Sequence, residues 1–293
     1  LIHESEEENT LKYIDQYSKQ VKETFDIILN LLNDKNENLR NLFLLQRISV
    51  FYPILIKTYI LDYTENKENF NKITNILEIF SFRILSLKIK RPNDVDSYLH
   101  KLANNFEGDY EKLILELKKK ILEFSPDNIL KTKLSSPNFY NEFVNNDINY
   151  LFWKYENFLR GNGKAKYGKM SEQEFSDQES KYKLSIEHIA SQNPKVTTEN
   201  IKFDGIDSEF QENYLHSIGN LTLDPQSANS SKGNKSVPEK ESKYFRKAPF
   251  MTQNELEEFM INNSWVKESI NKRKEKIIEF ALKNWDPEKI IKG

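Results

Sequence analysis

The feature that most constrains the fold of this chain is the spacing of its apolar residues between positions 9 and 160. They recur every three to four residues, which is the spacing of amphipathic helices. Four proline-containing breaks divide this pattern into successive segments. They lie at Pro53, Arg91-Pro92, Ser125-Pro126 and Ser136-Pro137. The pattern predicts a helical bundle over residues 1–160.

The pattern changes after residue 160. Residues 161–180 hold three of the eight glycines and few large apolar side chains, which indicates a loop or linker. Residues 181–189 alternate enough to predict one strand, and residues 221–223 predict a second, shorter strand. Helical spacing returns from Val237 onward. We therefore expect a mainly α protein in which a second domain, residues 161–293, embeds a small two-stranded element in C-terminal helices.

Composition narrows the classes of function. The absence of cysteine excludes disulfide frameworks, thiolate zinc sites and cysteine nucleophiles. No apolar run reaches the ~18–20 residues of a membrane helix, and the first ten residues do not resemble a signal peptide, so we expect a cytoplasmic protein. The formal net charge of −2 means that any field attracting nucleic acid must be local. The first residue is Leu rather than Met, which leaves open whether the chain is part of a longer protein.

Chemically useful residues gather around the two predicted strands. Glu187 and His188 end the first strand, where both side chains can reach one site. A carboxylate there can hold a hard divalent cation, and a neutral imidazole can take a proton from water. Asn220 precedes the second strand and Asn229 follows it, and an amide oxygen is a neutral ligand that suits Mg²⁺.

A local basic segment lies between Pro225 and Phe250. It holds six basic and two acidic residues, with Tyr244 and Phe245 among them. Such a segment is typical of a surface that neutralises backbone phosphates without reading sequence, although a solvated helix face has the same composition. The candidate DNA contacts, including one on the last predicted helix, are Lys232, Lys235, Lys243, Arg246 and Arg273.

The joint pattern SIEHIASQNP…YLHSIGNLTLDPQSANSSKGNKS resembles the HNH (ββα-metal) nuclease signature. More narrowly, it resembles the C-terminal nuclease domain of GmrSD-like type IV restriction enzymes and related phage-defence proteins. The resemblance covers roughly residues 148–286 and includes a downstream W…I…R…W spacing at Trp265, Ile270, Arg273 and Trp285. The preceding helices resemble the spacer that follows an N-terminal ParB-like NTPase module in such proteins. That module is not visible in this chain.

The resemblance implies a role for each motif residue. His188 would be the general base, Glu187 and Asn229 would bind Mg²⁺ or Mn²⁺, and Asn220 would pin the loop between the strands. Apart from the resemblance, His216 could orient Asn220 or contact DNA, and we expect a structural role behind the residues that contact the metal or the substrate. The chain departs from the family pattern at ASQNP, which replaces a direct Pro-Gln, and at Asp224, which is expected either to face solvent or to lie near the metal.

The expected function is that of a metal-dependent HNH endonuclease that cleaves or nicks DNA, in restriction of phage or modified DNA. Two other classes remain open from the sequence: a catalytically inert helical binding or scaffold module of a defence protein, and an RNase toxin. Glu187 and His188 would then form an ordinary strand end and Asn220 an ordinary turn residue. The targeted modification, the choice between nicking and double-strand cleavage, and the oligomeric state are not specified by the sequence.

Overall fold

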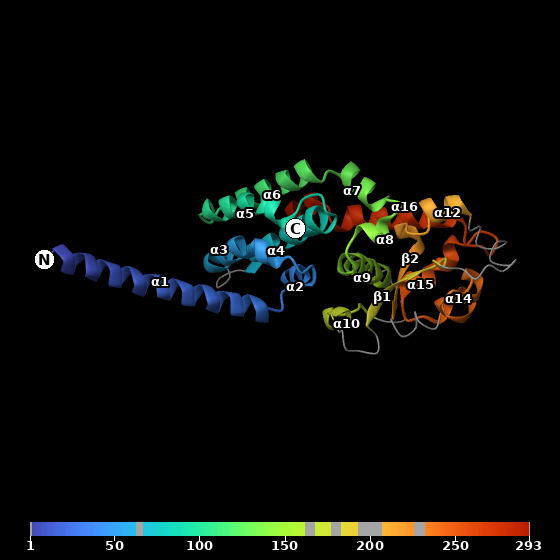
Figure 1. Ribbon diagram of the computed structural model, residues 1–293, viewed down its shortest axis with the longest axis horizontal. Coiled ribbons are helices and arrows are strands. Elements are labelled where there is room, and N and C mark those ends of the chain that lie inside the picture. Colours follow the sequence, from blue (N-terminus) through green and yellow to red (C-terminus); the bar gives the residue numbers. More distant parts are fainter. Residues whose placement is uncertain are drawn as a thin grey trace. The chain divides into compact units, whose positions relative to one another are not determined.

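The computed structural model describes residues 2–62, 67–161, 168–176, 183–192, 207–225 and 232–292. Over these ranges the chain is mainly helical with one two-stranded sheet, which confirms the predicted mainly α class. The chain forms two compact units, labelled by element in Figure 1. Unit 1 comprises Leu1–Glu78 and Arg91–Lys118, and unit 2 comprises Ile79–Lys90 and Lys119–Gly293. Within the described residues, no helix has the combined length and apolarity needed to cross a membrane.

Unit 1 is built from helices alone in its described part. They are α1 (Ile2–Asn33), α2 (Glu37–Leu44), the 3₁₀ turn η1 (Ile48–Phe51), α3 (Tyr52–Asp62), α4 (Lys67–Phe80), α5 (Pro92–Asn104) and the first turns of α6 (Tyr110–Phe124). The chain turns sharply after α2, where Gln46 has a positive φ of 58°. Pro53 lies in the first turn of α3, where its missing N–H removes no intrahelical hydrogen bond. The break in this apolar segment therefore precedes the proline.

The second proline break also begins a helix. A π-helical turn, η2 (Ser81–Ser86), follows α4, and Lys88 then adopts a left-handed conformation with φ of 52°. Pro92 is the first residue of α5. The Asp94 carboxylate accepts a hydrogen bond from the Arg91 backbone N–H at 2.9 Å, which satisfies a donor at the helix start. The same Arg91-Pro92 pair therefore ends one apolar pattern and caps the next.

Unit 2 surrounds the two strands with short helices. Besides η2 and the last turns of α6, its elements are α7 (Asp127–Leu134), α8 (Phe139–Glu142), α9 (Asn145–Gly161), α10 (Glu172–Ser176), β1 (Leu184–His188), α12 (Ser208–Asn213), η3 (Ile218–Asn220), β2 (Leu221–Pro225), α14 (Val237–Lys243), η4 (Phe245–Lys247), α15 (Met251–Asn254), η5 (Glu255–Phe259), α16 (Lys267–Asn284) and η6 (Pro287–Lys292). Helix α9 contacts both strands. Helix α9 and the sheet lie in the same compact unit, and the division at residue 160 into a helical bundle and a nuclease domain stays a prediction.

The two strands run antiparallel, with Glu187 opposite Thr222 and His188 opposite Leu221. Since side chains alternate along a strand, Glu187 shares one face of the sheet with Thr222 and Asp224, while His188 points to the other face. Every β2 residue is buried, and β1 becomes buried toward its end. The sheet thus carries the predicted site residues inside unit 2, and its polar face is largely removed from solvent.

Helix α16 fixes the start of β2. The Arg273 guanidinium is fully buried and donates hydrogen bonds to the backbone oxygens of Gly219 at 3.0 Å and Leu221 at 2.5 Å. It also donates to the Glu255 carboxylate at 3.0 Å. A Cβ at position 219 would overlap the backbone oxygen of Ile270, so only glycine allows α16 to approach so closely. The glycine of the GNLTL motif is therefore explained by packing.

Candidate active site

A pocket of about 300 Å³ opens at the end of β1. Its lining brings together Glu187 and His188 from β1 and Lys240 from α14. Tyr140 and Gln192 also line it, from α8 and from the loop that follows β1. Two of the sequence-predicted site residues therefore share one pocket, although their side chains leave opposite faces of the strand.

The His188 ring is buried and held on both sides. Its Nδ1 lies 2.8 Å from the Gln192 side-chain nitrogen, and its Nε2 lies 3.2 Å from Nδ1 of His216. Tyr140 packs edge-on against the ring, with centroids 4.6 Å apart. Burial, followed by the charges of His216 and Lys240, lowers the pKa of His188 to about 3. The imidazole is therefore neutral near physiological pH, which is the form that can accept a proton.

His216 lies beside His188 and is half-buried. Its ring stacks on Tyr140 with an interplanar angle of 14°, and its backbone oxygen accepts the Tyr140 N–H at 3.0 Å. Burial lowers the pKa of His216. The Gln192 amide nitrogen can only donate and lies nearer to Nδ1 of His188 than to Nε2, which favours the tautomer with its hydrogen on Nε2, facing Nδ1 of His216. His216 thus contacts the predicted base directly.

Glu187 is paired with a buried lysine. The Lys240 ammonium lies 2.6 Å from Oε1 of Glu187 and also donates to the backbone oxygens of His188 at 2.9 Å and Ile189 at 3.3 Å. Only 1% of Lys240 is exposed. Burial raises the pKa of Glu187, while the adjacent Lys240 acts in the opposite direction. All three ammonium hydrogens are therefore directed at the end of β1.

Asn220 connects the segments that follow β1 and precede β2. Its side-chain oxygen accepts hydrogen bonds from the Ala190 backbone N–H and the Trp265 indole, both at 3.0 Å. Its amide nitrogen donates to the backbone oxygens of Leu215 at 2.9 Å and Ala190 at 3.3 Å. The side chain is fully buried. The Asn220 side chain therefore joins the segments around both strands, and its catalytic role stays a prediction.

Asp224 is buried, not solvent-facing. Its Oδ1 accepts hydrogen bonds from the Lys232 ammonium at 2.5 Å and from the Gln253 amide at 2.7 Å. Its Oδ2 has no hydrogen-bond partner among the described residues. Burial raises the pKa of Asp224, against the opposing effect of Lys232. The Asp224 side chain lies on the same face of the sheet as Glu187, and it is not one of the residues that line the pocket.

The predicted DNA contacts divide into buried and exposed cations. Lys232 is 1% exposed and Arg273 is fully buried, so neither presents its charge to a phosphate in this structure. Our expectation for these two residues does not fit the fold, because each cation instead pairs with a buried carboxylate. Lys235 is half-buried, with its ammonium 3.3 Å from the Lys232 backbone oxygen. Lys243 and Arg246 are exposed and form ion pairs with glutamates on the same surface.

The structure describes one of the two predicted metal ligands, Glu187. Asn229 lies outside the described residues. Within the described ranges, no three His, Asp or Glu side chains are grouped to hold a metal ion. Glu187 lines the pocket, and its hydrogen bond with Lys240 is made through Oε1. A carboxylate oxygen fits Mg²⁺, which keeps several positions for water and phosphate.

Sequence reasoning missed three residues of the pocket. Lys240 was counted only within the basic segment, and Tyr140 and Gln192 were not singled out at all. Gln192 is four residues after His188, and Lys240 follows Pro238 in a short helix, but neither spacing indicates a contact. Tyr140 is 48 residues away from His188 in the sequence. Only the packing of α8 and α14 against the strand end reveals these neighbours.

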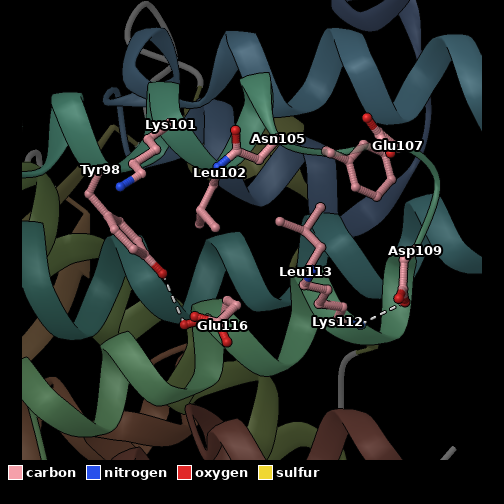
Figure 2. Close-up of a pocket in the computed structure, with 10 residues that line it drawn as sticks. Tyr98, Lys101, Leu102, Asn105, Glu107, Asp109, Lys112, Leu113 and Glu116 are labelled. Carbon is pink, nitrogen blue, oxygen red and sulfur yellow. Dashed lines mark hydrogen bonds between the residues drawn. The ribbon is translucent and has the colours of Figure 1, made fainter.

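A larger pocket of about 510 Å³ lies in unit 1, between α5 and α6 (Figure 2). Its lining includes the apolar residues Leu102, Phe106 and Leu113 and charged residues of both signs. Two of its polar groups serve the helices themselves. Tyr98 donates to the Glu116 backbone oxygen at 3.0 Å, and Asp109 accepts the Lys112 backbone N–H at 3.0 Å. None of the sequence-predicted site residues lies in it, so the smaller pocket remains the candidate site.

A comparison with known protein families matches the part of the chain that contains this pocket. The family model of GmrSD restriction endonucleases, C-terminal domain, matches residues 124–280, which is more than half of the chain. The matched range contains α7 to most of α16, both strands and the pocket at the end of β1. No curated protein sequence matches the chain at a significant level. The chain therefore belongs to the family of GmrSD restriction endonuclease C-terminal domains.

Proposed function

We propose that the pocket at the end of β1 is an HNH-type nuclease site that hydrolyses phosphodiester bonds of DNA. The observation that carries this proposal is the position of His188, which lies between Gln192 and His216 at a polar pocket within the region that matches a restriction-endonuclease family. The proposed biological setting is restriction of phage or modified DNA. An N-terminal ParB-like NTPase module is proposed as the partner of this domain.

His188 is proposed to act as the general base. Gln192 holds Nδ1 of His188 from the pocket side, and we place the attacking water at that position after the amide moves aside. The water oxygen attacks phosphorus, its proton passes to Nδ1, and the bond between phosphorus and the leaving oxygen breaks. The leaving oxygen takes a proton from solvent. An approaching phosphate raises the pKa of the imidazole because its negative charge stabilises the protonated ring.

Three other residues hold this arrangement. Lys240 fixes the Glu187 carboxylate and the backbone at His188. Asn220 keeps the segment after His188 next to the start of β2. Glu187, with Asn229 as the expected second ligand, would hold Mg²⁺ or Mn²⁺. A bound cation supplies charge neutralisation for the phosphate and its leaving oxygen.

The test compares two histidine variants on plasmid DNA. Purified wild-type chain should convert supercoiled plasmid to nicked or linear product in Mg²⁺ or Mn²⁺, and EDTA should stop the reaction. His188→Ala should lower the rate at least ~100-fold, since a general base contributes about 10²–10⁴. His100→Ala is the matched control, because His100 is an exposed histidine on α5 in unit 1. Circular dichroism should show both variants folded.

The same assay separates the competing functions. Cleavage of RNA but not DNA under one salt condition would favour an RNase. Equal DNA cleavage by wild type and His188→Ala would remove His188 from the reaction. A folded wild-type chain that binds DNA and cleaves neither nucleic acid, alone or with the full-length N-terminal module supplied, would favour an inert binding module.

A further inference from the structure

Helix α1 carries apolar side chains that unit 1 does not cover. It spans Ile2–Asn33, and every described side chain from residue 8 to residue 20 is exposed. Leu11 is 61% exposed and Phe25 is 62% exposed. Burial begins at Val21 and is complete at Leu31, so only the second half of the helix packs on its own unit. Figure 1 shows the first half running past α3. An apolar stripe of this length marks an interaction surface.

The spacing of the stripe identifies the kind of partner. Along α1, seven residues are separated by alternating steps of three and four positions, and six of these seven residues are apolar. They are Leu11, Ile14, Ser18, Val21, Phe25, Ile28 and Leu32. This is the 3.5-residue repeat of a coiled-coil seam, which is narrower than the face that packs on a globular core. The repeat therefore indicates that another helix covers the stripe.

The charges beside the seam favour a second copy in the opposite direction. Asp15 and Lys22 occupy equivalent flanking positions of successive heptads. If two copies of α1 run antiparallel with Ser18 beside the second copy's Val21, each Asp15 lies beside the other copy's Lys22. A parallel pair would place Lys22 beside Tyr17, with no opposite charge. Flanking charges of this kind set the orientation of coiled coils.

The position of the folded unit agrees with that orientation. Each unit 1 packs around the second half of its own α1, where Leu31 is buried. An antiparallel pair separates the two folded bodies to opposite ends of the paired helices. We propose that two copies of this chain associate through α1 as an antiparallel coiled coil. This inference does not depend on the nuclease activity.

The first experiment measures the mass of the full chain in solution by sedimentation equilibrium. A dimer of twice 34.8 kDa is expected at micromolar concentration. Phe25→Asp should give a monomer. Tyr13→Asp should remain dimeric, because Tyr13 is equally exposed on the same helix but lies outside the seam. A monomeric wild-type chain at 100-fold higher concentration, or equal effects of both variants, would overturn the proposal.

Two further sets of variants fix the orientation. Asp15→Lys and Lys22→Asp should each weaken the dimer at low salt, and the combination of both should restore it. Leu11→Cys is informative because the natural chain has no cysteine. In the antiparallel pair the two copies of residue 11 lie roughly 25 Å apart along the axis, at about 1.5 Å per residue. Disulfide-linked Leu11→Cys dimers would overturn the antiparallel arrangement, since a disulfide requires Cα atoms within about 7 Å.

Discussion

Two buried lysine–carboxylate pairs lie at the same two-stranded sheet, yet they serve different ends. Lys240 holds Glu187 at 2.6 Å, and Lys232 holds Asp224 at 2.5 Å, with each lysine 1% exposed. The first pair lines the pocket and also fixes the backbone at His188. Neither residue of the second pair lines the pocket, and the Gln253 amide donates a hydrogen bond to Asp224. The same pair of residue types thus positions the candidate site in one case and fills the interior in the other.

The comparison shows that burial of a charge does not by itself indicate function. Removing one partner of either pair leaves an uncompensated buried charge, which costs about 3–5 kcal/mol. Stability measurements should therefore fail to distinguish the two pairs. Activity measurements should distinguish them, because the Lys240 ammonium contacts Glu187 and His188 at the pocket, whereas the Lys232 ammonium contacts Asp224 and Gln253. The predictions below test this difference, beginning with the largest expected effect.

Lys240→Met should be the most damaging change. We expect a loss of about 3–5 kcal/mol of unfolding free energy, because Glu187 loses its buried partner. We also expect at least ~100-fold slower plasmid cleavage, since misplacing the base removes its contribution. Urea unfolding and cleavage below the melting temperature measure the two effects. Full activity in a folded Lys240→Met protein would contradict the positioning role.

Lys232→Met should cost the same stability, about 3–5 kcal/mol, but should spare cleavage at a temperature where the protein is folded. Combining it with Asp224→Leu should recover most of the lost stability, because an apolar pair replaces the ion pair without leaving a charge. A double-mutant cycle by urea unfolding measures the recovery. If Lys232→Met abolished cleavage as Lys240→Met does, the two pairs would not differ in function.

Trp265→Phe removes a hydrogen bond between two uncharged groups, the Trp265 indole and the Asn220 side chain. The indole N–H donates to the Asn220 oxygen at 3.0 Å, while the Ala190 N–H still donates to that oxygen after the change. We expect a loss of about 1–2 kcal/mol of stability, as for a buried hydrogen bond. Thermal unfolding monitors the change. A loss as large as that of the lysine variants would show that the charges are not what makes those pairs costly.

Lys243→Ala should have the smallest effect, because Lys243 is exposed and its ion pair with Glu239 is solvated. The melting temperature should not change. If Lys243 contacts a phosphate, the affinity for DNA should fall equally for all sequences. The slope of the logarithm of the binding constant against the logarithm of salt concentration should become smaller, by about the contribution of one phosphate contact. Fluorescence anisotropy over a salt series measures the slope. An unchanged slope would leave Lys243 outside the DNA surface.

Sequence periodicity predicted the mainly α class and both strands, because helix and strand spacing are local properties. The sequence also predicted that Glu187 and His188 share one site. Both line one pocket, because neighbours at a strand end remain neighbours in the fold. The motif further identified the family, which the matched region confirms. The metal, the catalytic role of His188 and the DNA contacts stay predictions.

The remaining errors share one physical cause. Lys232, Lys240 and Arg273 were interpreted by charge alone, and charge in a sequence does not show whether a carboxylate will bury it. Their partners lie 8, 53 and 18 residues away in the sequence. Such pairings depend on how α14 and α16 pack on the sheet, and no local spacing encodes that packing. The contact of Tyr140 with His188 escaped prediction for the same reason.

The guanidinium of Arg273 makes the start of β2 depend on residues synthesised about 50 positions later. While the ribosome is still extending the chain, Gly219 and Leu221 have emerged without the donor that holds their carbonyl oxygens. In a nascent or shortened product without α16, the pairing with β1 would hold the second strand, and the two carbonyl oxygens that Arg273 contacts would lack this donor.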